Sequence, residues 1–446
     1  MNNFRLTLMF LILTCTAYAQ EDNTTQTDWG KVEGLIRVYH VFAPAYVKSG
    51  RESDYDIDGS TIGGHLRYHT PELAGVGATT AVYYARGTGL NDKDDPNTIM
   101  AAGRFFTKDY SPKAVWGELN LHYKDDTHHG IIGRFKIDSP LTNSIYTFMP
   151  NMFQAALYEN SAGESTKITL VHIEKMAYGS RAPVEFGLIG EKTYTAGATQ
   201  PALDTRGDFL DIEKQTLDDP NAKTNGITAF AAENSSLSDT KVRLWNFYAY
   251  DIMNMAYVDA VYSKNDVSLP FSLSAQYLRT DSVGKNLVSK WMDSSSAYMY
   301  GAKATVKYGK AFFSLAYNHS GNSRIVNPWN GDPAYTSTFF SRNAYRANVD
   351  AYKAGFNYDI LDNLKLISYH ADYGKSSTPG TFTPSKPVEP IALAQADARE
   401  SGCLLSYKPI KGLTVFGGVI YKTSEYYVSG KQVELLDVDL VVTYTF

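Results

Sequence analysis

The most regular feature of the chain is an alternation of apolar and polar residues along short segments. Over residues 434–446 the apolar side chains fall on every second position: Leu436, Val438, Leu440, Val442, Tyr444 and Phe446. The same period recurs over 114–124 and 297–307. Side chains of a β-strand point alternately to its two faces, so each segment is predicted to be a strand with one apolar face.

Extending this reading predicts eighteen strands, with 183–190 and 227–233 as the weakest members and sixteen strands as the alternative. The approximate spans are 31–47, 60–70, 76–86, 114–124, 129–137, 167–176, 183–190, 227–233, 241–250, 253–262, 268–279, 297–307, 311–318, 346–359, 364–373, 396–408, 412–423 and 434–446. Short connections alternate with long ones almost throughout. An even strand count with this alternation predicts an all-β fold, a transmembrane antiparallel up-and-down β-barrel with short turns on the periplasmic side and long extracellular loops.

Residues 1–19 differ in character from the rest of the chain. Arg5 precedes an apolar stretch that ends in Ala17-Tyr18-Ala19, which predicts a signal peptide cleaved after Ala19. Residues 20–446 are then one barrel domain exported to the bacterial outer membrane. Cys403 is the one cysteine outside the predicted signal, so no intramolecular disulfide is expected.

Composition narrows the function further. The chain carries 42 basic and 47 acidic residues, which gives no broad basic surface for nucleic acid. No Gly-x-Ser-x-Gly elbow and no Gly-rich phosphate loop is present, so neither an enzyme nor a cofactor is expected. Asp54, Asp56 and Asp58 match the first half of a calcium loop near residues 49–59, but His65 occupies the position of the closing glutamate, which leaves a weak metal candidate.

Two stretches of sequence resemble a known family. Residues 58–71 read DGSTIGGHLRYHTP, and residues 133–151 contain GRFK, DSPL and MPN. Both are similar to OprD-type (Opr family) porins of Gram-negative outer membranes. The resemblance implies an 18-stranded diffusion channel for small, often carboxylate-bearing solutes, with inward loops at its constriction and a ladder of basic residues in its lumen. Phe446, with Leu440, Val442 and Tyr444 before it, looks like the C-terminal signal read by the barrel-assembly machinery.

Residues 138–165 are the candidate for the inward-folded constriction loop. Between Asp138 and Glu159 this stretch is uncharged and aromatic, which is unusual for a water-exposed loop. The residues expected to form the constriction are Thr142, Asn143, Ser144, Tyr146, Phe148, Met149, Asn151 and Phe153. An alternative is a loop that packs on itself over the rim.

Basic residues on the lumen parity are the candidates for solute contacts. They include Arg37, Arg67, Arg134, Lys136, Arg243, Lys303 and Lys353. Repeated weak contacts with such groups favour anionic solutes and still permit their exit. The alternative is that each one pairs with a neighbouring acidic side chain.

The sequence therefore predicts an outer-membrane porin that passes small hydrophilic solutes by passive diffusion, with a preference for anionic ones. Its expected partners are those solutes, outer-membrane lipid and lipopolysaccharide, and the assembly machinery, and the expected state is a monomer or homotrimer. Two alternatives stay open. One is a surface adhesin or receptor with a plugged lumen, and the other is a barrel hydrolase, which about ten to twelve strands would favour.

Overall fold

The structure is a computed structural model of the 446-residue chain. It describes residues 29–46, 57–90, 110–143, 147–163, 165–180, 206–217, 223–285, 294–323, 325, 327–329, 331–339, 341, 347–376, 395–426 and 432–446. Residues 1–19 and the predicted strand 183–190 lie outside this part of the chain.

Strands dominate the described residues. They are β1 (Lys31–Tyr46), β2 (Ile57–His69), β3 (Val76–Gly87), β4 (Lys113–Lys124), β5 (His128–Phe135), β6 (Met152–Ala162), β7 (Thr166–Ala177), β8 (Leu210–Asp211), β9 (Ile227–Asn234), β10 (Thr240–Ala249), β11 (Met253–Lys264), β12 (Phe271–Ser282), β13 (Ser296–Tyr308), β14 (Ala311–Ser320), β15 (Val349–Leu361), β16 (Leu364–Tyr373), β17 (Gln395–Tyr407), β18 (Leu413–Tyr426) and β19 (Gln432–Thr445). One short helix, α3 (Ile212–Leu217), follows β8. No helix in the described part of the chain has the length and apolar character needed to cross a membrane.

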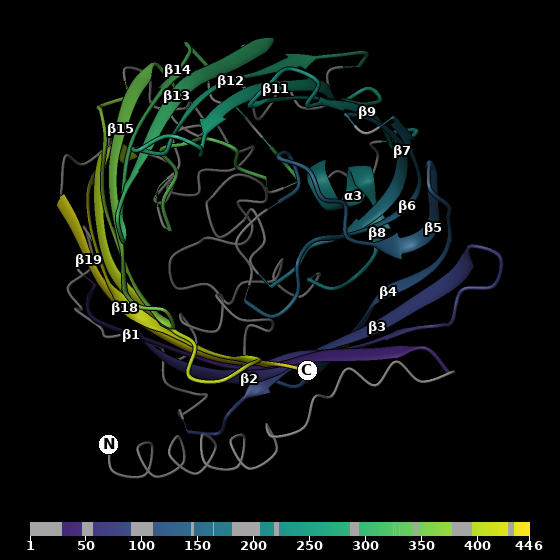
Figure 1. The fold of residues 1–446 in the computed structure, drawn as a ribbon, viewed down its shortest axis with the longest axis horizontal. Coiled ribbons are helices and arrows are strands. Elements are labelled where there is room, and N and C mark those ends of the chain that lie inside the picture. The colour runs from purple at the N-terminus through teal and green to yellow at the C-terminus, as the bar shows by residue number, and fades with distance from the viewer. Residues whose placement is uncertain are drawn as a thin grey trace.

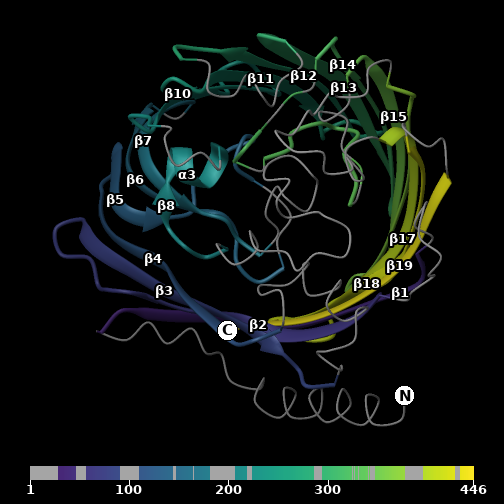
Figure 2. The same cartoon turned by 180° about the vertical axis from the view of Figure 1, so that it is seen from behind.

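The strands form one closed antiparallel barrel (Figure 1). Each pairs with its neighbours in sequence, β7 pairs with β9, and β1 pairs with β19 to close the ring. The two-residue strand β8 pairs with β7 alone, so eighteen strands make the wall. Seen from the opposite end, α3 lies inside this ring (Figure 2). The predicted fold class and the count of eighteen are confirmed.

The two faces of the wall follow the alternation of the sequence. Large apolar side chains exposed on the outer face include Leu66, Val82, Trp116, Leu119, Ile132, Leu170, Leu273, Phe313 and Leu315. The alternate positions point inward and are mostly buried. A barrel with an apolar outer face is built to lie in a hydrocarbon layer.

The closing seam joins the two ends of the chain. Leu440, Val442 and Tyr444 pair with His40, Val38 and Ile36 across β1 and β19. After the last strand, the Phe446 amide donates to the Gly34 carbonyl at 3.1 Å, and the Gly34 amide donates to the Phe446 carbonyl at 2.9 Å. The four residues proposed as an assembly signal therefore form the seam itself.

One predicted element is wrong in extent. The segment 138–165, expected to be a single loop, contains β6, so the inward loop ends at residue 151. The period-two signal fails here because the inward positions of β6 are also apolar. Phe153 and Ala155 are buried in an interior cluster, and Leu157 packs against it. The strand predicted at 227–233, by contrast, is β9.

Apolar residues also fill part of the barrel interior. One cluster joins inward side chains of β5 to β13 to Leu141, Tyr178, Ile212 and Trp329 from the connections. A second joins inward side chains of β1, β3, β4 and β19 to Phe148 and Met149. These clusters seat chain segments against the inner wall, and so position the candidate site.

Candidate functional site

Two of the connections that fold into the barrel form the candidate site. The first inner segment is the β5–β6 connection, described over 137–143 and 147–151, and the second is the part of the β14–β15 connection described between 325 and 341. Both carry buried residues from end to end. Because loops exposed to water do not bury their side chains in this way, both segments are structural parts of the interior.

The first inner segment is held against β1 and β19. The guanidinium of Arg37 donates to the carbonyl oxygen of Thr147 and, at 2.9 Å, to the hydroxyl of Thr443. Phe148 and Met149 are fully buried against the wall. Arg37 therefore holds the first inner segment beside β1 and β19, and the two apolar side chains hold it against the inner wall.

The second inner segment is hydrogen-bonded to the first. The Gly331 amide and the Asn327 side-chain amide both donate to the Leu141 carbonyl, at 3.1 and 2.9 Å. The Asn151 side-chain amide donates to the Trp329 carbonyl at 3.0 Å. The two segments thus behave as one hydrogen-bonded unit.

Trp329 is the largest buried side chain of this unit. It is fully buried, and its ring stacks on Phe247 of β10 with ring centroids 5.3 Å apart. Tyr178, which follows β7, donates its hydroxyl to the Pro328 carbonyl at 2.9 Å. Burial raises the pKa of Tyr178, so this hydroxyl keeps its proton and remains a donor. The second segment is therefore anchored to the wall on the side of β7 and β10.

From there the second segment runs across the inner wall toward β17. The backbone amides of Thr336 and Phe339 donate to Asn318 Oδ1 and Glu400 Oε1, both at 3.0 Å. Between them, the Ser337 carbonyl accepts from Lys353 Nζ at 2.7 Å. These partners lie on β14, β15 and β17. Polar side chains of the wall thus supply hydrogen-bond partners for backbone groups of the second inner segment.

A row of charged side chains crosses β1, β2 and β4. Arg67 donates to Glu118 at 2.5 and 3.1 Å and to Glu33 at 2.7 Å. Tyr83 donates its hydroxyl to Glu118 at 2.6 Å. One arginine therefore stands between two carboxylates, and the row carries no excess of positive charge.

A second ion pair lies across β10 and β11. Arg243 binds both carboxylate oxygens of Asp259, at 2.9 and 2.6 Å. Tyr335 of the second inner segment lies nearby, and its burial, together with the Asp259 carboxylate, raises its pKa to about 12. Its hydroxyl is therefore neutral near pH 7, and a proton donor remains beside the pair.

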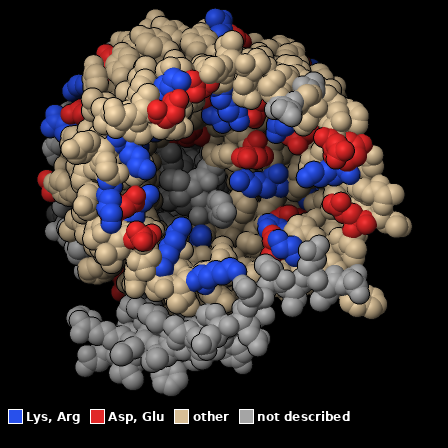
Figure 3. Space-filling model, in the orientation of Figure 1, with Lys and Arg blue, Asp and Glu red and all other residues tan. Residues whose placement is uncertain are grey.

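The other basic candidates have varied surroundings. The Arg134 guanidinium lies over the Phe209 ring, 4.2 Å from its centroid. Lys136 is exposed after the end of β5. Lys303 is half-buried on the inward face of β13, and Lys353 adds a contact of 5.6 Å with the Tyr369 ring to its bond with the second segment. Figure 3 shows Lys and Arg side chains around the mouth of the barrel, with Asp and Glu among them.

The predicted constriction residues differ in what they contact. Thr142 is buried and donates its hydroxyl to the Ile137 carbonyl at 2.7 Å, while Asn143 is exposed beside Asp138. Asn151 is buried between the two inner segments, and Phe153 lies in β6. Ser144 and Tyr146 lie outside the described residues. The buried members hold the segment in place instead of facing solvent.

The described part of the weak calcium candidate does not bring metal ligands together. Asp54 and Asp56 lie outside the described residues. Asp58 is on β2, with Oδ1 3.8 Å from Nδ1 of His40. Nowhere in the described ranges do three metal-ligating side chains gather.

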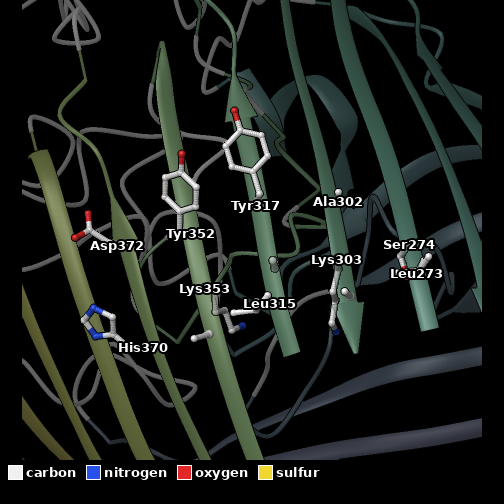
Figure 4. Close-up of a pocket in the computed structure, with 13 residues that line it drawn as sticks. Leu273, Ser274, Ala302, Lys303, Leu315, Tyr317, Tyr352, Lys353, His370 and Asp372 are labelled. Carbon is white, nitrogen blue, oxygen red and sulfur yellow. The ribbon is translucent and has the colours of Figure 1, made fainter. Parts of the chain in front are cut away.

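The wall itself carries a groove of about 550 Å³ across β12 to β16 (Figure 4). Leu315 and Tyr352 in its lining are exposed, and Tyr317, Tyr352 and His370 have outward parity. It therefore opens on the apolar outer face, away from the inner segments, and is not the candidate site.

Comparison with known proteins finds likeness at the level of structure alone. No protein-family model and no curated protein sequence matches the chain. Among solved structures it is similar to OpdK of Pseudomonas aeruginosa, with a TM-score of 0.67 and 12% identity over 93% of this chain and 98% of that one. It is also similar to OccK9 (OpdG) of P. aeruginosa and to OccAB3 of Acinetobacter baumannii, each with a TM-score of 0.68, 12% identity and the same coverage.

The chain has the OprD-type porin fold.

Several residues that organise the interior of this OprD-type barrel were not predicted from the sequence. Ser180, Arg206, Asn327 and Trp329 lie in connections that period-two analysis does not describe. A tryptophan between Pro328 and Pro333 in a polar connection was the available hint, since a large apolar residue in a loop needs a place to be buried.

Gly331 lies at a close approach between the two inner segments of the OprD-type barrel. A Cβ atom at this position would lie 2.1 Å from the backbone carbon of Leu141. We expect Gly331→Val to separate the segments, at a cost of about 1–3 kcal/mol for overpacking. The emission of Trp329 should then shift to the red as water reaches it. The same change in a Trp329→Phe background should give no shift, and an unshifted spectrum in the native background would contradict the contact.

Proposed function

We propose that this protein is an outer-membrane diffusion channel for small hydrophilic solutes that works without chemistry or cofactor. The observation that carries the proposal is the structural similarity of the chain to porins over 93% of its length. A barrel of eighteen strands is too wide to be filled by the side chains of its own wall. Eighteen strands also exceed the ten to twelve that would have favoured a hydrolase.

The remaining partners follow from the same proposal. The protein is exported with its signal removed after Ala19, inserted by the barrel-assembly machinery through the seam residues near Phe446, and surrounded by lipid and lipopolysaccharide as a monomer or homotrimer. The short turns face the periplasm, and the inner segments narrow the lumen from the long-loop side. The apolar outer face supports the lipid surroundings, and the pairing of Phe446 with Gly34 supports a role of the C-terminus in closing the barrel.

The proposal also includes a preference for anionic solutes. Among solved relatives in fold, one structure is of OpdK with vanillate and another is of OccK2 in complex with glucuronate, and both of these solutes are carboxylates. Here Lys303, Lys136 and Arg37 supply positive charge near the inner segments, which favours anions. The ion pairs of Arg67 and Arg243 reduce this effect, so we propose a modest anion preference.

Single-channel recording tests the function. The protein should insert into a planar bilayer and give steady ohmic steps, with a reversal potential in a salt gradient that indicates a modest anion preference. Cation preference would retain the channel and reject the anion proposal. Insertion without conductance would reject the channel in favour of an adhesin or receptor.

Glu118→Gln tests whether the carboxylates set the size of the preference. The amide keeps an acceptor for Tyr83 and removes one negative charge beside Arg67. A unit charge about 8 Å from a passing ion is worth roughly 0.5 kcal/mol in water, with opposite sign for an anion and a cation, so the anion-to-cation permeability ratio should rise about fivefold. Glu72→Gln, in an exposed turn, is the matched control and should leave the ratio unchanged. An equal shift in both variants would show a surface effect.

A further inference from the structure

The end of β7 approaches the first inner segment at backbone contact. The Ser180 amide donates to the Met149 carbonyl at 2.9 Å. The next residue back, Gly179, donates its amide to Asn151 Oδ1 at 2.8 Å. A Cβ atom on Gly179 would lie 2.1 Å from the Met149 oxygen, so only glycine fits there.

The hydroxyl of Ser180 lies in the middle of this contact. The backbone amides of Thr147, Phe148 and Met149 point to its oxygen, at 3.1, 2.8 and 3.1 Å. The same hydroxyl donates to the Met149 carbonyl at 3.1 Å. Successive amides that point to one place form a concave donor site that requires an acceptor. Ser180 is completely buried, and within this contact its hydroxyl oxygen is the acceptor for these amides.

Ser180 is itself held from behind. Arg206, also buried, donates from Nη1 to the Ser180 carbonyl at 2.8 Å, and the Arg206 carbonyl accepts from Lys113 of β4. Lys113 also pairs with Asp208 at 3.5 Å. The hydroxyl is therefore attached through the backbone to the end of β7 and, through Arg206, to β4. Because Ser180 is held by both β7 and Arg206, its hydroxyl can fix the position of residues 147–149 relative to the barrel wall.

We propose that Ser180 is the positioning residue of the constriction: its hydroxyl fixes residues 147–149 and so sets the width and steadiness of the lumen. The proposal rests on the proposed channel function, but the contact it describes does not. Arg37 binds the same stretch through the Thr147 carbonyl. Hydrogen bonds to both the amides and a carbonyl of this stretch restrict the position of residues 147–149.

Ser180→Ala isolates the hydroxyl, because alanine fits wherever serine does. The substitution removes the oxygen that accepts hydrogen bonds from three buried backbone amides. Unsatisfied buried donors should raise the opening equilibrium of residues 147–149 about tenfold or more. Hydrogen–deuterium exchange of peptides covering 147–151 should therefore accelerate by about that factor. Single-channel records should show substates and added current noise, while the heat-modifiable band of the folded barrel is retained.

Ser320→Ala is the matched control. Ser320 is equally buried at the end of β14, and its hydroxyl lies 3.4 Å from the amide and carbonyl of Val349 on the next strand. This variant should leave exchange at 147–151 and the current noise unchanged. Unaltered exchange in Ser180→Ala would overturn the proposal, as would equal acceleration in both variants. If the native protein conducts no ions, the channel function fails, and the exchange experiment still decides whether Ser180 positions the segment.

Discussion

Trp329→Ala should release both inner segments without opening the barrel wall. Loss of a fully buried tryptophan costs about 3–5 kcal/mol. The ring stacks on Phe247, and the Trp329 carbonyl holds Asn151, so the lost packing weakens the seat of both segments. The strand pairings of the wall do not involve this side chain. A loss of about 3 kcal/mol changes the seated-to-released ratio by roughly a factor of 100.

The measurement has two parts. Single-channel conductance should rise and fluctuate among levels, while the folded barrel keeps its mobility in unheated gels. Trp116→Ala is the control, since Trp116 is more than half exposed on the outer face and should leave conductance at the native value. An unchanged, steady conductance in Trp329→Ala would mean that the two segments do not limit the lumen.

Asp259→Ala should be the most destabilising change in the wall. Asp259 is 2% exposed and binds both donors of the Arg243 fork. Breaking a buried pair costs about 3–5 kcal/mol because the remaining charge loses its partner, and the lower end applies here because the Arg243 side chain is 35% exposed. The urea midpoint of unfolding in lipid should fall accordingly, and the unpaired guanidinium should shift the reversal potential toward greater anion preference.

A double variant separates charge from packing. Arg243→Met together with Asp259→Ala should recover most of the lost stability, because no unpaired charge remains. Asp266→Ala, in an exposed turn, should change the midpoint by no more than about 1 kcal/mol. If Asp259→Ala alone falls within that range, the pair is not important for stability.

Strands could be predicted from sequence because the outer face of the wall is apolar almost everywhere, whatever the inward residues are. β6 shows the limit of that signal. Its inward residues Phe153, Ala155 and Leu157 are apolar because they seat the inner segments, so the alternation disappears. An interior that packs loops cannot be recognised from a rule that assumes a water-filled lumen.

The partners of the basic candidates could not be predicted, because parity gives the face of a residue and not its register. Glu33 lies directly opposite Arg67, and Ala81 separates Arg67 from Glu118 in the same row. The small side chain of Ala81 lets the guanidinium reach a carboxylate two strands away. The position of Arg67 in the alternation therefore predicted correctly that its side chain points inward. It could not show that Arg67 lies between two carboxylates that balance its charge.

The inner segments were predictable in part. An uncharged aromatic stretch after β5 indicated a loop with an apolar environment, and Phe148 and Met149 are buried as such a loop requires. The second segment was not predicted, because its polar and turn-forming residues resemble an ordinary outer loop. Ser180 was not predicted either, since one serine after a strand gives no sign that three amides meet at its oxygen.

The seam between β1 and β19 also has a consequence for how the molecule is made. Arg37 and Thr443 are hydrogen-bonded although 406 positions separate them in sequence. Bringing such distant residues together costs about 5 kcal/mol of chain entropy by the logarithmic loop law. During folding the edge of β1 that pairs with β19 therefore stays unpaired until this last strand is available. We expect changes near Phe446 to lower the yield of folded barrel more than they lower the stability of barrels that have closed.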